Sequence, residues 1–186
     1  MLVKKIISST LIALVIAVST IVFSSSANAQ TNTTPTTPTA ATQSKRCTVA
    51  QGRLTTLITT FDAAKAKHTQ AYGELITKFE TRIDSAQKNG YDVTEMTKAR
   101  DEAKAKIEVY TQKNTTLTTA VNGTKNLACG DSDSGFTTSL TSSRSALTET
   151  RTSAAAVRTA FTEGIIASLK DYALWLNQQS ATGEDK

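Results

Sequence analysis

The amino-acid sequence predicts an all-α fold, an elongated antiparallel three-helix bundle with coiled-coil-like packing and one disulfide. Three observations lead to this prediction. Apolar residues recur at the three- and four-residue steps of one helical face over three long segments. Aromatic residues make up only 5% of the chain and prolines are rare, which argues against a β-sandwich. Two glycine-containing breaks divide the periodic region into segments of similar length, and short connections between such helices make antiparallel neighbours.

The N-terminal residues have the three-part pattern of a secretory signal peptide. Lys4 and Lys5 precede an apolar run, Ile6–Phe23, and small residues follow at 27–29. We therefore predict a signal peptide at residues 1–29, cleaved near Ala29, and an extracytoplasmic mature chain that is secreted, periplasmic or at the cell surface. The alternative is an uncleaved anchor, because the run approaches the roughly 18 to 20 residues needed to span a bilayer.

Residues 30–46 are rich in threonine and contain both prolines, Pro35 and Pro38. They show no apolar periodicity and have little to bury, so we expect a flexible, disordered linker. A threonine-proline tract of this kind can also accept O-linked sugars. A plain spacer is the simpler interpretation.

The first helix is predicted at about residues 48–88. It should end at Asn89 and Gly90, where glycine can adopt the left-handed conformation that closes a helix. The apolar residues that define its stripe are Leu54, Ile58, Phe61, Tyr72, Leu75, Ile76, Phe79 and Ile83.

The second helix is predicted at about residues 93–128. Asp92 can accept hydrogen bonds from the free amides of the first turn, and Glu95 completes a capping-box pattern. The stripe continues through Met96, Ala103, Ile107, Tyr110, Leu117 and Val121.

The third helix is predicted at about residues 134–178, followed by a disordered tail at 179–186. The polar segment before it, 131–135, is similar to the start of a calcium loop, but its glycine is fifth rather than sixth and its twelfth residue is Ser142. We therefore interpret these residues as helix caps and predict no metal site. The stripe of this helix comprises Phe136, Leu140, Leu147, Ala154, Val157, Phe161, Ile165, Leu169, Tyr172 and Leu176.

The two cysteines test the predicted hairpin. Cys47 lies 43 residues before Gly90 and Cys129 lies 39 residues after it, so a turn at Gly90 brings both to the same end. We predict a disulfide between them, as an oxidising compartment would allow. A redox-active pair is the alternative, but the close spacing that tunes thiol acidity is missing.

The sequence contains one histidine, His68, which excludes a zinc site built from clustered histidines. Folding about Gly90 places His68 opposite residues 110–114, where it would form a polar layer that fixes the helix register. No nucleophile elbow, phosphate-binding loop or zinc-protease motif occurs. We predict no enzyme activity, no catalytic residues and no cofactor.

The third helix ends in its most apolar stretch, at 165–176. Ile166, Leu174 and Trp175 exceed what one buried stripe needs, so they form a candidate interaction patch for a protein partner or a membrane surface. The alternative is a core that is better covered at that end.

Loss of Lys4 and Lys5 with the signal peptide would lower the formal net charge from +5 to +3. The remaining lysines alternate with acidic residues along the chain. This is too weak a positive charge to predict nucleic acid as a partner.

Four features taken together resemble a group of uncharacterised exported helical-hairpin, coiled-coil proteins of candidate-phylum (Patescibacteria) bacteria. These are Cys47, the turn Gly90-Tyr91-Asp92, the segment Leu127-Ala128-Cys129-Gly130, and Gly135-Phe136 at the start of the third helix. The resemblance covers about residues 47–176. It implies an exported helical protein and carries no activity with it.

We therefore expect a non-enzymatic structural or protein-interaction module of the bacterial cell envelope, whose partner is another envelope protein or a surface component. The alternative is an extracytoplasmic chaperone-like or lipid-surface-binding helical protein, in peripheral contact with a membrane. The oligomeric state is not predicted.

Overall fold

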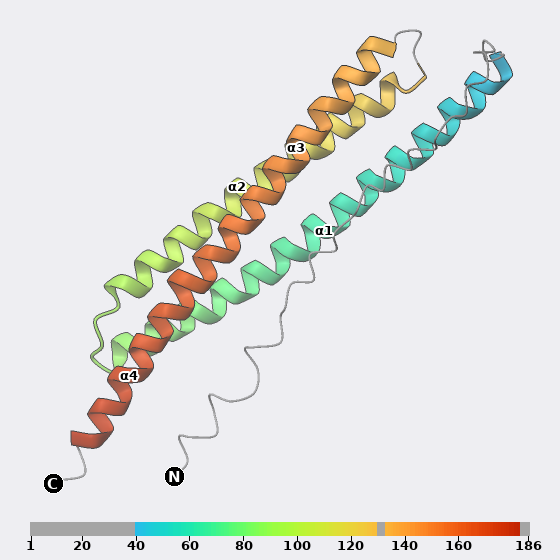
Figure 1. Ribbon diagram of the computed structural model, residues 1–186. Coiled ribbons are helices and arrows are strands. Elements are labelled where there is room, and N and C mark those ends of the chain that lie inside the picture. Colours follow the sequence, from blue (N-terminus) through green and yellow to red (C-terminus); the bar gives the residue numbers. More distant parts are fainter. Residues whose placement is uncertain (1–39, 130–132, 183–186) are drawn as a thin grey trace, which may run out of the picture. The chain divides into compact units, whose positions relative to one another are not determined.

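The computed structural model describes residues 40–129 and 133–182 (Figure 1). The predicted signal peptide, linker residues 30–39 and tail residues 183–186 lie outside this part. The all-α fold is confirmed, and the described residues contain no strand. Helix α1 spans Ala40–Lys88 and α2 spans Thr94–Leu127. The third predicted helix consists of α3 (Asp133–Thr159), a π-helical segment η2 (Ala160–Ile165) and α4 (Ile166–Thr182).

The turn between α1 and α2 is centred on Gly90, as predicted. Gly90 has a φ of +83°, a conformation that residues with a Cβ atom rarely adopt. The Tyr91 amide donates to the Ala86 carbonyl at 3.0 Å, and the Gly90 amide donates to the Gln87 carbonyl at 3.0 Å. These two bonds form a Schellman motif, which satisfies the last carbonyls of α1. They also explain why the chain reverses at this glycine.

The start of α2 differs from the predicted capping box. Asp92 Oδ1 accepts hydrogen bonds from the Thr94 amide at 3.0 Å and from Thr94 Oγ1 at 2.6 Å. These bonds lower the pKa of Asp92 because they favour the charged carboxylate. Glu95 lies 3.7 Å from Lys98 on the surface of the first turn. Asp92 therefore caps the first turn through Thr94, and the role predicted for Glu95 is wrong.

Two helix ends lie outside the predicted bounds. Helix α1 begins at Ala40, within the predicted linker, and α4 continues to Thr182, within the predicted tail. No proline occurs after Pro38, and both extensions contain alanine and glutamine, which favour helix. Lack of apolar residues was therefore a poor guide to where these helices end.

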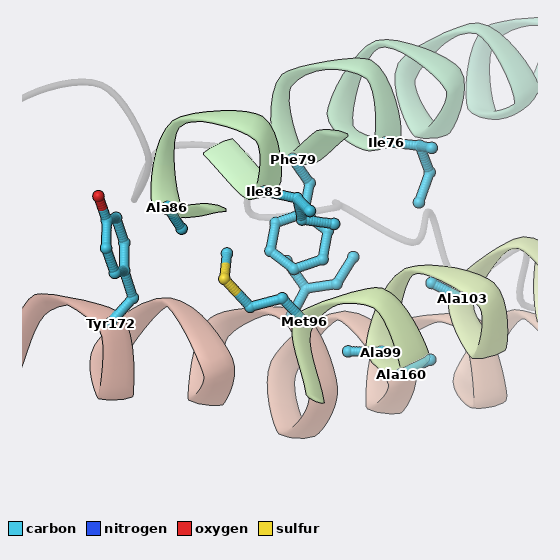
Figure 2. Packing of buried hydrophobic residues seen from close by; sticks show 10 residues of the cluster. Ile76, Phe79, Ile83, Ala86, Met96, Ala99, Ala103, Ala160 and Tyr172 are labelled. Carbon is cyan, nitrogen blue, oxygen red and sulfur yellow. The ribbon is translucent and has the colours of Figure 1, made fainter. Parts of the chain in front are cut away.

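A large hydrophobic cluster joins α1, α2, η2 and α4 near the turn. Figure 2 shows Phe79 and Ile83 of α1 reaching toward Met96 of α2, with Tyr172 on α4. Met96 is fully buried. The same cluster also contains Ile76, Ala86, Ala99, Ala103, Ala160 and Ile165.

A smaller cluster lies nearer the cysteines. Leu117 and Val121 of α2 pack with Ala146 of α3. The α1 residues Leu54, Ile58 and Phe61 cover them but are only partly buried. The predicted stripe of α1 thus faces the core along its length, yet its N-terminal half is less well covered than its C-terminal half.

Small and polar residues fill much of the interface between α2 and α3. Thr124 Oγ1 lies 2.9 Å from Ser139 Oγ and 2.8 Å from Ser143 Oγ, and Thr150 Oγ1 donates to the Lys113 carbonyl at 3.1 Å. Within the described residues, every buried side-chain nitrogen or oxygen has a hydrogen-bond partner. These paired hydroxyl groups fix the register of α3 on α2, because a shift would leave them buried and unpaired.

The π-helical segment η2 corrects the prediction of one regular third helix. Buried residues of this helix recur at steps of three or four up to Ala160, and the next buried residue is Ile165, five positions later. A continuous α-helix would turn Asp171, eleven residues after Ala160, toward the core in place of Tyr172. The extra residue in η2 restores the apolar face. A Cβ atom at Gly164 would lie 3.4 Å from the Ala99 side chain, an ordinary van der Waals distance, so this part of η2 packs closely on α2.

Candidate functional site

The disulfide joins the first turns of α1 to the end of α2. Cys47 and Cys129 are bonded, and their Cα atoms are 5.0 Å apart. The pairing follows from the turn at Gly90 and from the similar lengths of chain on either side of it. It closes a sequence separation of 82 residues, so it holds the less well-covered half of α1 against α2.

His68 lies in a layer of aromatic and polar side chains that joins α1, α2 and η2. Its Nδ1 atom is 2.7 Å from Tyr110 Oη, which confirms the predicted position opposite α2. The ring centroid of Tyr72 lies 6.0 Å from that of Tyr110 and 5.7 Å from that of Phe161. Buried Asn114 completes the layer by donating to the Tyr110 carbonyl at 2.9 Å. The imidazole is therefore packed beside the rings of Tyr72 and Tyr110 and remains partly exposed.

The surroundings of His68 favour its neutral form. Burial, followed by the nearby charge of Lys67, lowers the pKa of His68 from its ordinary value of 6.5. Burial likewise raises the pKa of Tyr72 and of Tyr110. All three shifts disfavour charge in this layer, which suits a packing role.

We predict that the free energy of unfolding decreases as the pH falls below about 6.5, because the unfolded chain then takes up a proton that folded His68 resists. The decrease ends once the pH passes the lowered pKa of the folded state. Uptake of one full proton on unfolding would change the free energy of unfolding by about 1.4 kcal/mol per pH unit. We expect a smaller slope, because the partial exposure of His68 screens the effect. Urea unfolding between about pH 7.5 and about pH 5 measures it.

The control for this prediction is His68→Gln, which keeps a polar group beside Tyr110 but does not titrate. Its unfolding free energy should stay level across the same range. An equal pH dependence in wild type and in His68→Gln would assign the effect to other groups.

The structure separates the three residues of the predicted patch. Ile166 and Leu174 are exposed, with 40% and 60% of their surface accessible. Trp175 is partly buried, and its ring centroid lies 5.5 Å from that of Tyr91 and 6.1 Å from that of Tyr172. Trp175 thus belongs to the aromatic cluster that packs α4 on the turn, and it is less exposed than the other two residues of the predicted patch.

Two exposed apolar side chains of α4, Ile166 and Leu174, lie on the side away from the core. They are eight residues apart, about 80° around the helix axis, and Lys170 lies between them. Ser168 and Tyr172 are buried on the opposite side. Leu176 follows Tyr172 by four residues on that buried side and is 37% exposed. We call Ile166 and Leu174 the exposed apolar residues of α4.

Sequence reasoning also missed an uneven distribution of charge. The hairpin and the third helix bring residues 40–61, 109–129 and 133–148 together around the disulfide. These segments contain six lysines and arginines, but their one acidic residue is Asp133. The alternation of charge that we described along the chain is therefore wrong at this end. Counting acids and bases within each folded segment, instead of over the whole chain, could have revealed it.

A shallow surface hollow of about 540 Å³ beside Gly73 is lined by residues of α1 alone, so it brings no groups together from different elements. Across residues 40–129 and 133–182, no three His, Cys, Asp or Glu side chains gather where they could hold a metal ion. None of the described helices has the length and hydropathy needed to cross a membrane.

Comparisons with protein-family models, with curated proteins and with solved structures find no match for this chain.

Proposed function

We propose that this protein is a non-enzymatic, exported structural or interaction module of the bacterial cell envelope, and that α4 carries its contact with another envelope protein. The observation that supports this proposal is the exposure of Ile166 and Leu174 on the outward side of α4. Export is supported by the pattern at residues 1–29 and by the disulfide, a bond that persists in oxidising compartments.

The exposed apolar residues of α4 are not needed for the core. The buried side of the same helix already supplies Ser168 and Tyr172, and Trp175 packs on Tyr91. A helix with apolar residues on its outer side can lay them in the groove of a partner. Ile166 and Leu174 lie two turns apart and flank one outward side of α4, which favours a protein partner with an apolar groove.

Crosslinking from single positions tests this contact. A photo-reactive amino acid is placed at Leu174, and separately at Val109, which is 44% exposed on α2 and serves as the matched control. Irradiation of cells that produce the protein should join position 174, and not position 109, to one defined envelope protein. Binding of that purified protein should then be lost in Leu174→Asp and kept in Val109→Asp.

Both aspartate variants should retain the circular dichroism of the wild type, since both positions are exposed. Identical crosslinked products from the two positions, or none from position 174, would count against a partner site on α4.

A further inference from the structure

The charged residues are divided unequally between the two ends of the bundle. Fourteen of the sixteen acidic residues lie at 62–108 and 149–186, where lysines and arginines nearly balance them. The segments around the disulfide hold most of the excess positive charge of the mature chain. The end at which α1 begins is therefore basic, whereas the end at the Gly90 turn is close to neutral.

The basic residues of α1 lie along one outward side. Lys45, Val49 and Arg53 follow one another at four-residue steps, and Lys67 returns to the same side after six turns. All four residues are exposed, and they lie opposite the half-buried side that contains Leu54. We call Lys45, Arg53 and Lys67 the basic stripe of α1.

The positive charges of the basic stripe are not neutralised within the bundle. The salt bridges among the described residues join Lys98, Arg100, Lys104 and Lys113 to acidic neighbours, and none includes a residue of the stripe. The charges of the stripe are thus available to an anionic partner.

An exposed apolar side chain accompanies these charges. Val49 is 54% exposed within the stripe. Basic residues together with an exposed apolar one suit an anionic lipid surface, where the charges meet headgroups and the apolar group enters the boundary below them. A soluble phosphate polymer would use the charges alone. Val49 therefore favours lipid.

The direction of the chain gives a second argument for lipid. The predicted apolar segment Ile6–Phe23 precedes α1, so the chain enters the bundle at the basic end. A segment of this kind is inserted in a membrane during export. The basic end is accordingly the end joined to the membrane-inserted segment while the chain is being exported.

We infer that the basic stripe of α1 binds an anionic lipid surface, with Val49 at the headgroup boundary. This surface differs from the proposed protein contact on α4. The protein would then meet a membrane at its disulfide end and a protein partner at its turn end.

Vesicle sedimentation tests this inference with the chain from Gln30 onward, which contains the whole compact unit Pro38–Lys186. The protein should bind phosphatidylcholine vesicles that contain about one-third phosphatidylglycerol and should not bind pure phosphatidylcholine. Reversing the stripe with Lys45→Glu, Arg53→Glu and Lys67→Glu should weaken binding by about a hundredfold or more. Added salt should weaken wild-type binding, because it screens the charges.

The matched control reverses three exposed basic residues of the third helix, which lie away from the stripe on α1: Arg151→Glu, Arg158→Glu and Lys170→Glu. This variant has the same net charge as the stripe variant but should keep most of its binding. An equal loss in both variants would overturn the inference, because it would show an effect of total charge. Failure to bind the anionic vesicles would overturn it as well.

Val49→Ser separates lipid from soluble phosphate. It leaves the net charge unchanged and should still weaken vesicle binding, because Val49 would no longer enter the headgroup boundary. Unchanged vesicle binding by Val49→Ser, together with full competition by polyphosphate, would assign the stripe to a soluble anion and overturn the lipid surface. The crosslinks from position 174 do not depend on either result, so the two proposals can fail separately.

Discussion

Deletion of Thr162 from η2 is expected to leave the bundle folded and to change the free energy of unfolding by no more than about 1 kcal/mol. Thr162 is exposed, and its hydroxyl bonds only to carbonyls of its own helix, those of Arg158 and Thr159. Without it, the five-residue step from Ala160 to Ile165 becomes a step of four. The buried side then continues as in a regular α-helix, with Ser168 and Tyr172 still facing inward.

Deletion of Thr148 is the matched control and should be severely destabilising. Thr148 is also exposed and also bonds to a carbonyl one turn earlier, that of Arg144. Its loss would rotate the rest of the helix by about 100° and place Arg151 and Arg158 where Thr150 and Val157 are buried. A buried unpaired charge costs about 3 to 5 kcal/mol. Urea unfolding, followed by circular dichroism, compares the two deletions directly.

A loss in the Thr162 deletion as large as that in the Thr148 deletion would contradict this account of η2. It would mean that the π-helical geometry itself, and not only the register that it restores, is needed for the fold.

Replacing Cys47 and Cys129 with serine is the second change with a large expected effect. The bond closes a separation of 82 residues, and the chain-entropy model gives it a stabilisation of about 4 to 5 kcal/mol. Without it, the N-terminal half of α1 depends on Leu54, Ile58 and Phe61, which are only partly buried. We therefore expect a large decrease in the free energy of unfolding. We also expect local opening of the part of α1 that is N-terminal to His68.

Hydrogen exchange distinguishes local opening from general unfolding. In the serine variant, amides at 48–66 should exchange much faster, whereas amides at 72–88 should stay protected by the larger cluster around Phe79 and Met96. Wild-type protein in a reducing agent should behave in the same way. Unchanged exchange at 48–66 would show that packing alone holds this half of α1.

Much of the fold could be predicted because it follows from residues close together in the sequence. Gly90 ends α1 wherever the helix is placed, since its backbone conformation and the bonds at Ala86 and Gln87 are local. The cysteine spacing then fixed the pairing of α1 with α2, and the same hairpin brought His68 to Tyr110. In both cases, the number of residues counted from the turn at Gly90 was enough to predict which residues lie side by side.

The candidate surfaces were harder to predict, because exposure depends on three helices at once. Leu174, Trp175 and Leu176 are consecutive apolar residues, yet Trp175 packs on Tyr91 while the leucines are exposed. The basic stripe of α1 was missed for a different reason. Charge was counted over the whole chain, although residues 40–61 contain three basic residues and no acidic one.

The sequence by itself determined the helical fold, the turn and the disulfide, because helix periodicity, a glycine turn and the distances from it are properties of neighbouring residues. Only the tertiary structure decided that the third helix contains η2, and which apolar residues remain exposed. Both depend on how α2 packs against the other helices. The five-residue step to Ile165 keeps the apolar side of the third helix against α2, where Ala99 lies next to Gly164.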